Sequence, residues 1–196
     1  EKKAEKKEGS DVKVAIICSA AGQNDNGYNQ SAVEGAKKAA DEFGIEYKVV
    51  EPTTGVPQAL ESLADDGYNV IFNLEYDFEA LIQGTGGAQP IAEMYPDTTF
   101  VCVNDNPNQD KDGKTIHDNV ISVLFDVHQA SFVAGALTTL VNENAETLFG
   151  TDDYNFTPAD DGGRSVGFIG GTNSNGITVF SYGYIEGINY EAEKLG

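Results

Sequence analysis

The chain alternates short apolar runs with amphipathic stretches over its first two thirds. Five runs are nearly continuous in hydrophobic and β-branched residues, the pattern of strands that are covered on both faces of a parallel sheet. This alternation is typical of βαβ units and predicts an α/β fold with a doubly wound parallel sheet. The predicted strands span residues 12–18, 47–51, 69–74, 98–104 and 119–125.

Four helical stretches accompany these strands, with apolar residues three and four positions apart. Gly44 and Gly67 end the first two, because glycine readily adopts the left-handed conformation that closes a helix. Pro57 suits the first turn of the second, where its missing N–H would have no partner within the helix. The stretches run from 32 to 43, from 57 to 67, from 89 to 94 and from 128 to 141.

The last quarter of the chain differs from the rest. Residues 143–163 are acidic and poor in aliphatic side chains, which predicts a long surface loop or a connection between lobes. A sixth strand is expected at 164–171, followed by a helix. Because a lone βα unit cannot bury its own apolar faces, residues 164–196 are predicted to open a second lobe that the chain leaves incomplete. Residues 12–142 form the predicted first lobe, and the charged residues 1–11 form a flexible tether.

The amino-acid composition argues against proteins that bind nucleic acid and proteins that span a membrane. The net charge is −20, from 32 acidic against 12 basic side chains. Such a chain repels nucleic-acid backbones and anionic lipid surfaces, so neither is a predicted partner. No run approaches the roughly 20 apolar residues that a membrane-spanning helix needs. The content of 40% hydrophobic and 22% charged residues is that of a folded globular protein.

The chemistry-bearing residues do not form a catalytic pattern. Cys18 and Cys102 lie inside apolar runs and are predicted to be buried, unpaired thiols, because an intervening strand would separate their backbones by about 10 Å. His117 and His128 lack the spacing of metal ligands and are expected at the surface or at a helix cap. The glycine-rich run at 167–171 lacks the lysine of a phosphate-binding loop. No enzyme activity, cofactor or metal is therefore predicted.

A candidate binding site lies where the predicted strands end, since ligands of parallel sheets bind beyond the carboxyl ends of the strands. After the first strand come Asp25, Tyr28 and Asn29, which offer an acceptor, an aromatic face and an amide that both donates and accepts. Asp25 and Tyr28 are interpreted as ligand contacts, while Asn29 is either a contact or a helix cap. Asn73 and Asp105, after the third and fourth strands, would complete a polar rim suited to hydroxyl groups.

An ordered set of motifs resembles the basic membrane protein family. The motifs, in chain order, are D-x-x-Y-N-Q at 25–30, G-Y-N-V-I-F at 67–72, A-E-M-Y-P-D-T-T-F-V-C-V-N-D at 92–105, N-V-I-S-V-L-F at 119–125, S-F-V-A-G-A-L at 131–137, V-G-F-I-G-G at 166–171 and F-x-x-G-Y-x-x-G at 180–187. The likeness extends from Val12 to Tyr190. Members of this family are bacterial substrate-binding lipoproteins of ABC importers, and several are purine nucleoside receptors.

The resemblance implies the fold and the ligand. The chain would be the first lobe of a type I periplasmic binding protein, with strand order 2-1-3-4-5, plus the opening βα unit of the second lobe. A purine nucleoside or similar nucleoside would be clamped between the lobes. Tyr28 and Phe180 would stack on its base, with Asp25 and Asn29 near the base and Asp105 near the ribose.

The resemblance also implies a location and a partner. The protein would be extracytoplasmic and held at the bacterial cell membrane by a lipid anchor upstream of the chain, with an ABC transporter permease as its partner. The family motif has phenylalanine where Tyr28 stands, which keeps the aromatic face. Gly171 would let the backbone approach the ligand closely. With most of the second lobe missing, nucleoside binding by this chain is expected to be weak.

Two alternatives stay open. In the first, the same fold binds a sugar or another small polar metabolite, and replacing Tyr28 by alanine would then matter less than replacing Asp105. In the second, the chain is a doubly wound α/β enzyme, which would require a nucleophile with a base in reach. The sequence offers no such pair.

Overall fold

The computed structural model describes residues 11–150, 164–171 and 173–196, which belong to two compact units. Unit 1 ends at Leu124 and unit 2 begins at Phe125. In unit 2, helix α5 (Val127–Glu143) packs on the last helix of the chain, α7 (Asn175–Leu195).

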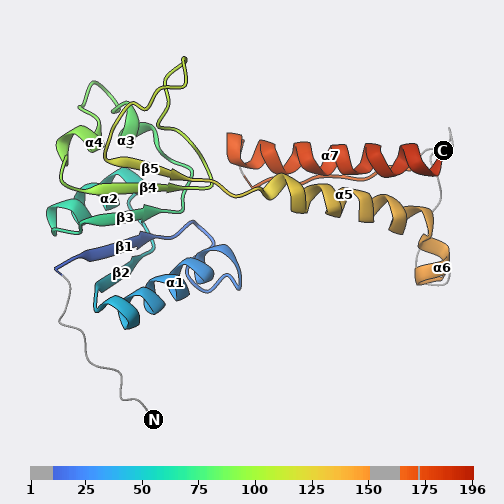
Figure 1. Ribbon diagram of the computed structural model, residues 1–196, viewed down its shortest axis with the longest axis horizontal. Coiled ribbons are helices and arrows are strands. Elements are labelled where there is room, and N and C mark those ends of the chain that lie inside the picture. Colours follow the sequence, from blue (N-terminus) through green and yellow to red (C-terminus); the bar gives the residue numbers. More distant parts are fainter. Residues whose placement is uncertain (1–10, 151–163, 172) are drawn as a thin grey trace, which may run out of the picture. The chain divides into compact units, whose positions relative to one another are not determined.

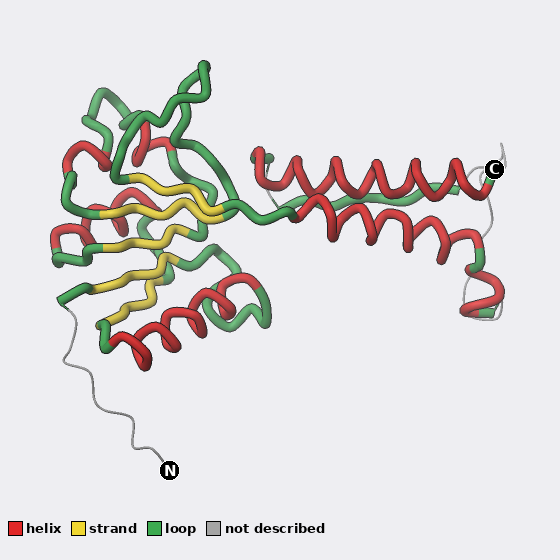
Figure 2. Tube along the Cα trace, in the orientation of Figure 1, coloured by secondary structure: helices red, strands yellow, loops and turns green. Residues whose placement is uncertain are grey.

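Unit 1 is built on a sheet of five parallel strands (Figures 1 and 2). Their order is β2-β1-β3-β4-β5, which confirms the predicted doubly wound arrangement. In register, Ile17 lies opposite Asn73 and Asn73 opposite Cys102, so β1, β3 and β4 end at one edge. The strands are β1 (Lys13–Ile17), β2 (Glu46–Val50), β3 (Val70–Asn73), β4 (Thr99–Val103) and β5 (Val120–Val123).

Helices cover both faces of this sheet, as the unbroken apolar strands predict. On one face Ile16 and Val101 pack with Ala32 and Val33 of the first helix. On the other face the alternate strand residues, such as Phe100, pack with the remaining helices. The helices of unit 1 are α1 (Tyr28–Phe43), α2 (Val56–Asp65), α3 (Glu79–Ile82) and α4 (Ile91–Met94).

A glycine turn separates α3 from α4. Gly84 has a φ of 73°, and a Cβ on it would lie 2.0 Å from the carbonyl oxygen of Ala88. A side chain is therefore excluded at this position, both by the backbone conformation and by the close approach. The turn allows α3 and α4 to be two short helices on the same face of the sheet.

The two cysteines are buried in unit 1, as predicted. Cys18 directly follows β1 and Cys102 lies in β4, and neither thiol is accessible to solvent. Strand β3 separates the two strands that carry them. Both side chains serve as small apolar residues in the core of the sheet.

In unit 2, α5 and α7 contact each other through glycines. A Cβ on Gly135 would lie 2.1 Å from the carbonyl oxygen of Tyr184, and one on Gly187 would lie 2.0 Å from that of Phe132. At these two positions the helix backbones lie so close together that no residue with a Cβ fits. The hydroxyl of Ser131 adds a hydrogen bond of 2.6 Å to the carbonyl of Phe180.

The strand predicted near the end of the chain is wrong. Residues 164–171 form no strand, and Ile169 is 98% exposed. A strand needs a neighbouring strand for its backbone hydrogen bonds, and the other described elements of unit 2 are helices. Within the predicted loop at 143–163, Ala145–Phe149 form a short helix, α6. Residues 151–163 and the predicted tether at 1–10 lie outside the described residues.

Candidate functional site

Asp25 gathers the free backbone N–H groups at the start of α1. Its Oδ1 accepts hydrogen bonds from the amides of Gly27 (3.0 Å) and Gln30 (3.1 Å). Its Oδ2 accepts from the backbone (3.0 Å) and side-chain (3.1 Å) amides of Asn29. The hydrogen bonds from the amides of Asn29 and Gln30 hold the pKa of Asp25 below its ordinary value. Because a carboxylate has about four acceptor positions, all are occupied, and Asp25 acts as a helix cap.

Asn29 locks the end of β1 to α1. Its side chain is fully buried, its Oδ1 accepts from the backbone amide of Ser19 (2.8 Å), and its Nδ2 donates to the hydroxyl of Ser19 (2.8 Å) and to Asp25. Every polar atom of the Asn29 side chain is therefore paired within the protein. Of the two interpretations of Asn29, the structure favours a structural role at the helix start over direct ligand contact.

Tyr28 bridges the loop after β1 and the end of β4. Its ring is half-buried against the sheet, and its hydroxyl donates a 3.2 Å hydrogen bond to the carbonyl of Val103. Burial, together with nearby Tyr76 and Glu75, raises the pKa of Tyr28 far above its ordinary value, so the hydroxyl stays protonated. Since the hydroxyl is bound to the protein, the aromatic ring is the part of Tyr28 left for a ligand.

Asn73 shapes the turn that follows β3. It is buried, its Oδ1 accepts from the amide of Glu75 (3.0 Å), and its Nδ2 donates to the carbonyl of Asp77 (3.4 Å). Glu75 in turn accepts a hydrogen bond from the amide of Ala20 in the loop after β1. Asn73 therefore holds the neighbouring loops together instead of facing outward.

Asp105, which follows the end of β4, has a carboxylate oxygen to spare. It is half-buried, and its Oδ1 accepts a 2.7 Å hydrogen bond from the amide of Asn106. From the residues that the structure describes, its other oxygen accepts no hydrogen bond. Of the five site residues predicted in unit 1, Asp105 is thus the one best placed to accept from ligand hydroxyl groups.

Tyr76 also lies beside the candidate site, and the sequence reasoning missed it. Its hydroxyl accepts a 2.9 Å hydrogen bond from the side chain of Asn104, the residue before Asp105. Tyr76 stands three residues after the end of β3, and an aromatic residue so close to a strand end was the available signal. The pairing itself joins two loops and could not be inferred from spacing along the chain.

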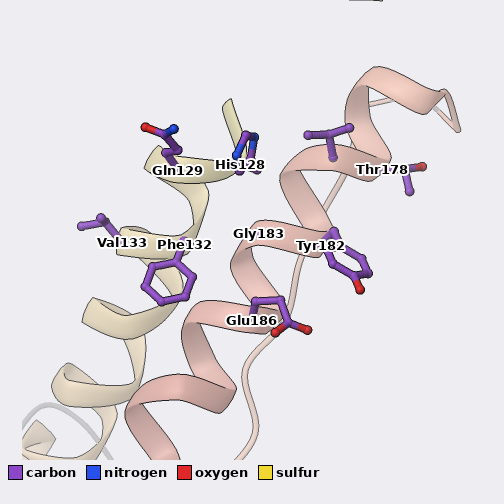
Figure 3. A pocket seen from close by; sticks show the side chains of 9 residues that line it. His128, Gln129, Phe132, Val133, Thr178, Tyr182, Gly183 and Glu186 are labelled. Carbon is purple, nitrogen blue, oxygen red and sulfur yellow. The ribbon is translucent and has the colours of Figure 1, made fainter. Parts of the chain in front are cut away.

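The other two predicted residues, Phe180 and Gly171, belong to unit 2. Phe180 is half-buried on α7, and Gly171 is exposed just before that helix. Unit 2 has a hollow of about 790 Å³ along α5 and α7, which neither residue lines; Figure 3 shows Phe132 and Tyr182 among its lining side chains. The atoms exposed in it are almost all carbon. A hydroxylated ligand would find few hydrogen-bond partners there.

The two histidines form no metal site. His117 is buried, not at the surface as expected, and its Nε2 donates a 2.8 Å hydrogen bond to the carbonyl of Ile82. His128 is exposed in the first turn of α5. In the described parts of the chain, no three His, Cys, Asp or Glu side chains are grouped to hold a metal ion. No helix in those same parts is long and apolar enough to cross a bilayer.

Comparisons with known proteins give a consistent picture. An uncharacterized lipoprotein of Pyrococcus abyssi is 26% identical over 97% of this chain and 41% of its own length. A protein of Lactococcus lactis named ABC transporter nucleoside-binding protein BmpA is 27% identical over 91% of this chain and 43% of its own length. The chain thus spans about two fifths of the curated relatives it matches.

A solved structure supports the fold. A solute-binding protein of an ABC transporter system from Aeropyrum pernix matches with a TM-score of 0.71 and 20% identity, over 94% of this chain and 45% of that one. The family model described as ABC transporter substrate-binding protein PnrA-like matches residues 12–195. The chain therefore belongs to the PnrA-like family of ABC transporter substrate-binding proteins, also called the Bmp family.

Proposed function

We propose that this chain supplies part of the ligand site of an extracytoplasmic solute-binding protein that delivers a purine nucleoside, or a similar nucleoside, to an ABC importer. One observation carries the proposal: the hydroxyl of Tyr28 binds the carbonyl of Val103, two residues before Asp105. An aromatic face and a carboxylate with a spare acceptor therefore belong to the same edge of the sheet. Ligands of parallel sheets bind at this edge.

The chemistry of these two groups suits a nucleoside. A flat base stacked on the Tyr28 ring gains about 0.5–1.5 kcal/mol per aromatic pair beyond the burial of apolar surface. A carboxylate such as that of Asp105 can accept from two neighbouring hydroxyl groups, as a ribose presents them. Asp25 and Asn29 contribute by fixing the start of α1, which carries Tyr28. Phe180 and Gly171 are proposed as contacts from the second lobe.

The relatives support the ligand class and the location. The Lactococcus lactis relative is named as nucleoside-binding, and the Pyrococcus abyssi relative is named as a lipoprotein. We infer that the protein works outside the cytoplasm, held at the cell membrane by a lipid anchor upstream of Glu1, and that its partner is the permease of the importer. The net charge of −20 keeps the protein itself from binding anionic lipid.

Nuclear magnetic resonance titration of the chain tests the proposal, because it detects binding even at millimolar affinity. Adding inosine, guanosine or adenosine should shift the backbone signals of residues 19–30 and 103–106, and ribose alone should shift them less. Tyr28→Ala should weaken nucleoside binding at least as much as Asp105→Ala, while Gln30→Ala serves as a control beside the site. Shifts that favour ribose, or a greater effect of Asp105→Ala, would instead indicate a sugar ligand.

A further inference from the structure

The turn after β4 has an unusual backbone conformation. Asn104 has a φ of 62°, and among the described residues the only other non-glycine residue with positive φ is Asn26. Asparagine tolerates this left-handed region better than most residues, but still at a cost. The amide of Asn104 donates a 2.7 Å hydrogen bond to the carbonyl of Val123, which extends the pairing of β4 with β5. The direction in which Asp105 leaves the strand therefore depends on Asn104.

The side chain of Asn104 is held by Tyr76. Its Nδ2 donates a 2.9 Å hydrogen bond to the Tyr76 hydroxyl, and Asn104 is buried. The Tyr76 ring meets the ring of Phe78 edge to face, with centroids 6.3 Å apart, and Phe78 belongs to the apolar core under α2. Through this contact, Tyr76 anchors the turn after β4 to a rigid part of the unit.

A second hydrogen bond fixes the same turn from the other side. The hydroxyl of Tyr28 donates to the carbonyl of Val103, the residue before Asn104. Asn104 is thus fixed through its preceding carbonyl, its own amide and its side chain. Beyond the turn, the amide of Asn106 donates to the Asp105 carboxylate, so the Asn106 amide reports directly on whether that carboxylate is in place.

We propose that Tyr76 is a positioning residue, which acts through Asn104 to hold the left-handed turn and so fixes the carboxylate of Asp105 where a ligand meets it. The ligand role of Asp105 rests on the proposed function. The positioning of Asp105 by Tyr76 does not, because it is a property of the free protein.

Tyr76→Phe is the decisive variant, because it keeps the ring that contacts Phe78 and removes only the hydroxyl. In the full chain without ligand, we expect the amides of Asn104 and Asn106 to exchange with solvent about fivefold faster, the change that the loss of one ordinary hydrogen bond produces. Tyr95→Phe is the matched control. It also removes a tyrosine hydroxyl bonded to a side chain, the carboxylate of Asp65 at 2.9 Å, but at a site away from the turn.

A second pair of variants tests whether Tyr76 acts through Asn104. Asn104→Gly keeps the left-handed conformation available and should raise exchange at Asn106 less than Asn104→Ala does. Adding Tyr76→Phe to Asn104→Gly should cause no further increase at Asn106, since the hydrogen bond between the Tyr76 hydroxyl and residue 104 is already lost in Asn104→Gly. Additive effects would overturn the proposal, because Tyr76 would then act by another route.

The remaining outcomes separate this inference from the proposed function. Unchanged exchange at Asn104 and Asn106 in Tyr76→Phe would overturn the inference, and so would an equal rise throughout β3 and β4, which indicates a merely structural role. If the wild-type chain binds no nucleoside while Tyr76→Phe still loosens Asn106 alone, the proposed function fails and the positioning role stands. If nucleosides bind, Tyr76→Phe should weaken them severalfold and leave the binding of a free base unchanged.

Discussion

Replacing Asn29 by alanine tests the most densely bonded side chain of the candidate site. Asn29 is fully buried, and its side chain makes three hydrogen bonds, two to Ser19 and one to Asp25. Alanine keeps the helix and removes all three. The backbone amide of Ser19 and part of the Asp25 carboxylate then lose their partners in a half-buried region.

The expected loss of stability follows from these bonds. A typical intramolecular hydrogen bond contributes about 0.5–1.5 kcal/mol net, and a buried donor left unpaired costs about 1–3 kcal/mol. Water can reach Ser19 in part, which reduces the second cost, so Asn29→Ala should lower the free energy of unfolding by about 2–4 kcal/mol. With a denaturant slope of about 2 kcal/mol per molar, the urea midpoint of unit 1 falls by about 1–2 M.

Urea denaturation followed by two-dimensional nuclear magnetic resonance measures this loss, because backbone signals from β1 and β3 report on unit 1 alone. Gln30→Ala is the control: it is the next residue of the same helix, and its side chain makes one exposed hydrogen bond to Glu34, worth at most about 0.5 kcal/mol. If the two variants unfold at the same urea concentration, the side chain of Asn29 does not fasten β1 to α1 and the reasoning is refuted.

Asn29→Asp adds a pH-dependent version of the same test. The new carboxylate keeps the shape of the side chain but lies in a buried place beside the carboxylate of Asp25, 3.1 Å from the present Nδ2. Burial and like charge both raise the pKa of such a group. An acid with a raised folded-state pKa destabilises the protein once the pH exceeds its unfolded value near about 4. The deficit of Asn29→Asp should therefore shrink as the pH falls from about 7 toward about 4. That of Asn29→Ala should stay nearly constant over this range, because the Asp25 carboxylate has a lowered pKa and stays ionised.

Two further predictions concern packing and thiol chemistry. Gly187→Ala should destabilise the pairing of α5 with α7 by about 1–3 kcal/mol, because its Cβ would lie 2.0 Å from the carbonyl of Phe132. Gly35→Ala, on the open face of α1, should instead stabilise by up to about 1 kcal/mol, and thermal melts that change alike in the two variants would contradict the helix contact. Burial raises the pKa of Cys102 to about 12 and also raises that of Cys18, so at pH 8 neither thiol should react with a colorimetric thiol reagent until urea unfolds the protein. Fast reaction of either thiol in the native protein would show that the core is open.

The sheet could be predicted from the sequence because parallel strands that are buried on both faces leave continuous apolar runs. Four of the five strands lie within their predicted ranges, and β2 begins one residue before its range. The strand order implied by the family resemblance is the one observed. The run at 164–171 has the same apolar character but forms no strand. Its residues have a high propensity for strands. A strand also needs a neighbouring strand to pair with, and the propensity of its own residues does not show whether one is present.

The sequence predicted where the candidate site lies better than it predicted what each of its residues does. Tyr28 and Asp105 lie at the expected edge of the sheet, since register alone brings strand ends together. Asp25 and Asn29 lie there too, but their polar atoms are used within the protein. The type of a residue shows that its side chain can accept or donate hydrogen bonds. It does not show whether nearby backbone groups already form those hydrogen bonds.

The helices of unit 2 show why periodicity alone could not assign their contacts. On α5 the large apolar residues Val133 and Leu137 are more than half exposed, while Ser131 and Gly135 are buried against α7. The apolar stripe was visible in the sequence, but the tight contact uses the small residues beside it, because only these allow two backbones to approach so closely. A hydrophobic stripe indicates which face of a helix gains from being covered. It does not identify the neighbour, and in α5 the contact with α7 is made by Phe132 and by small residues, while Val133 and Leu137 stay exposed.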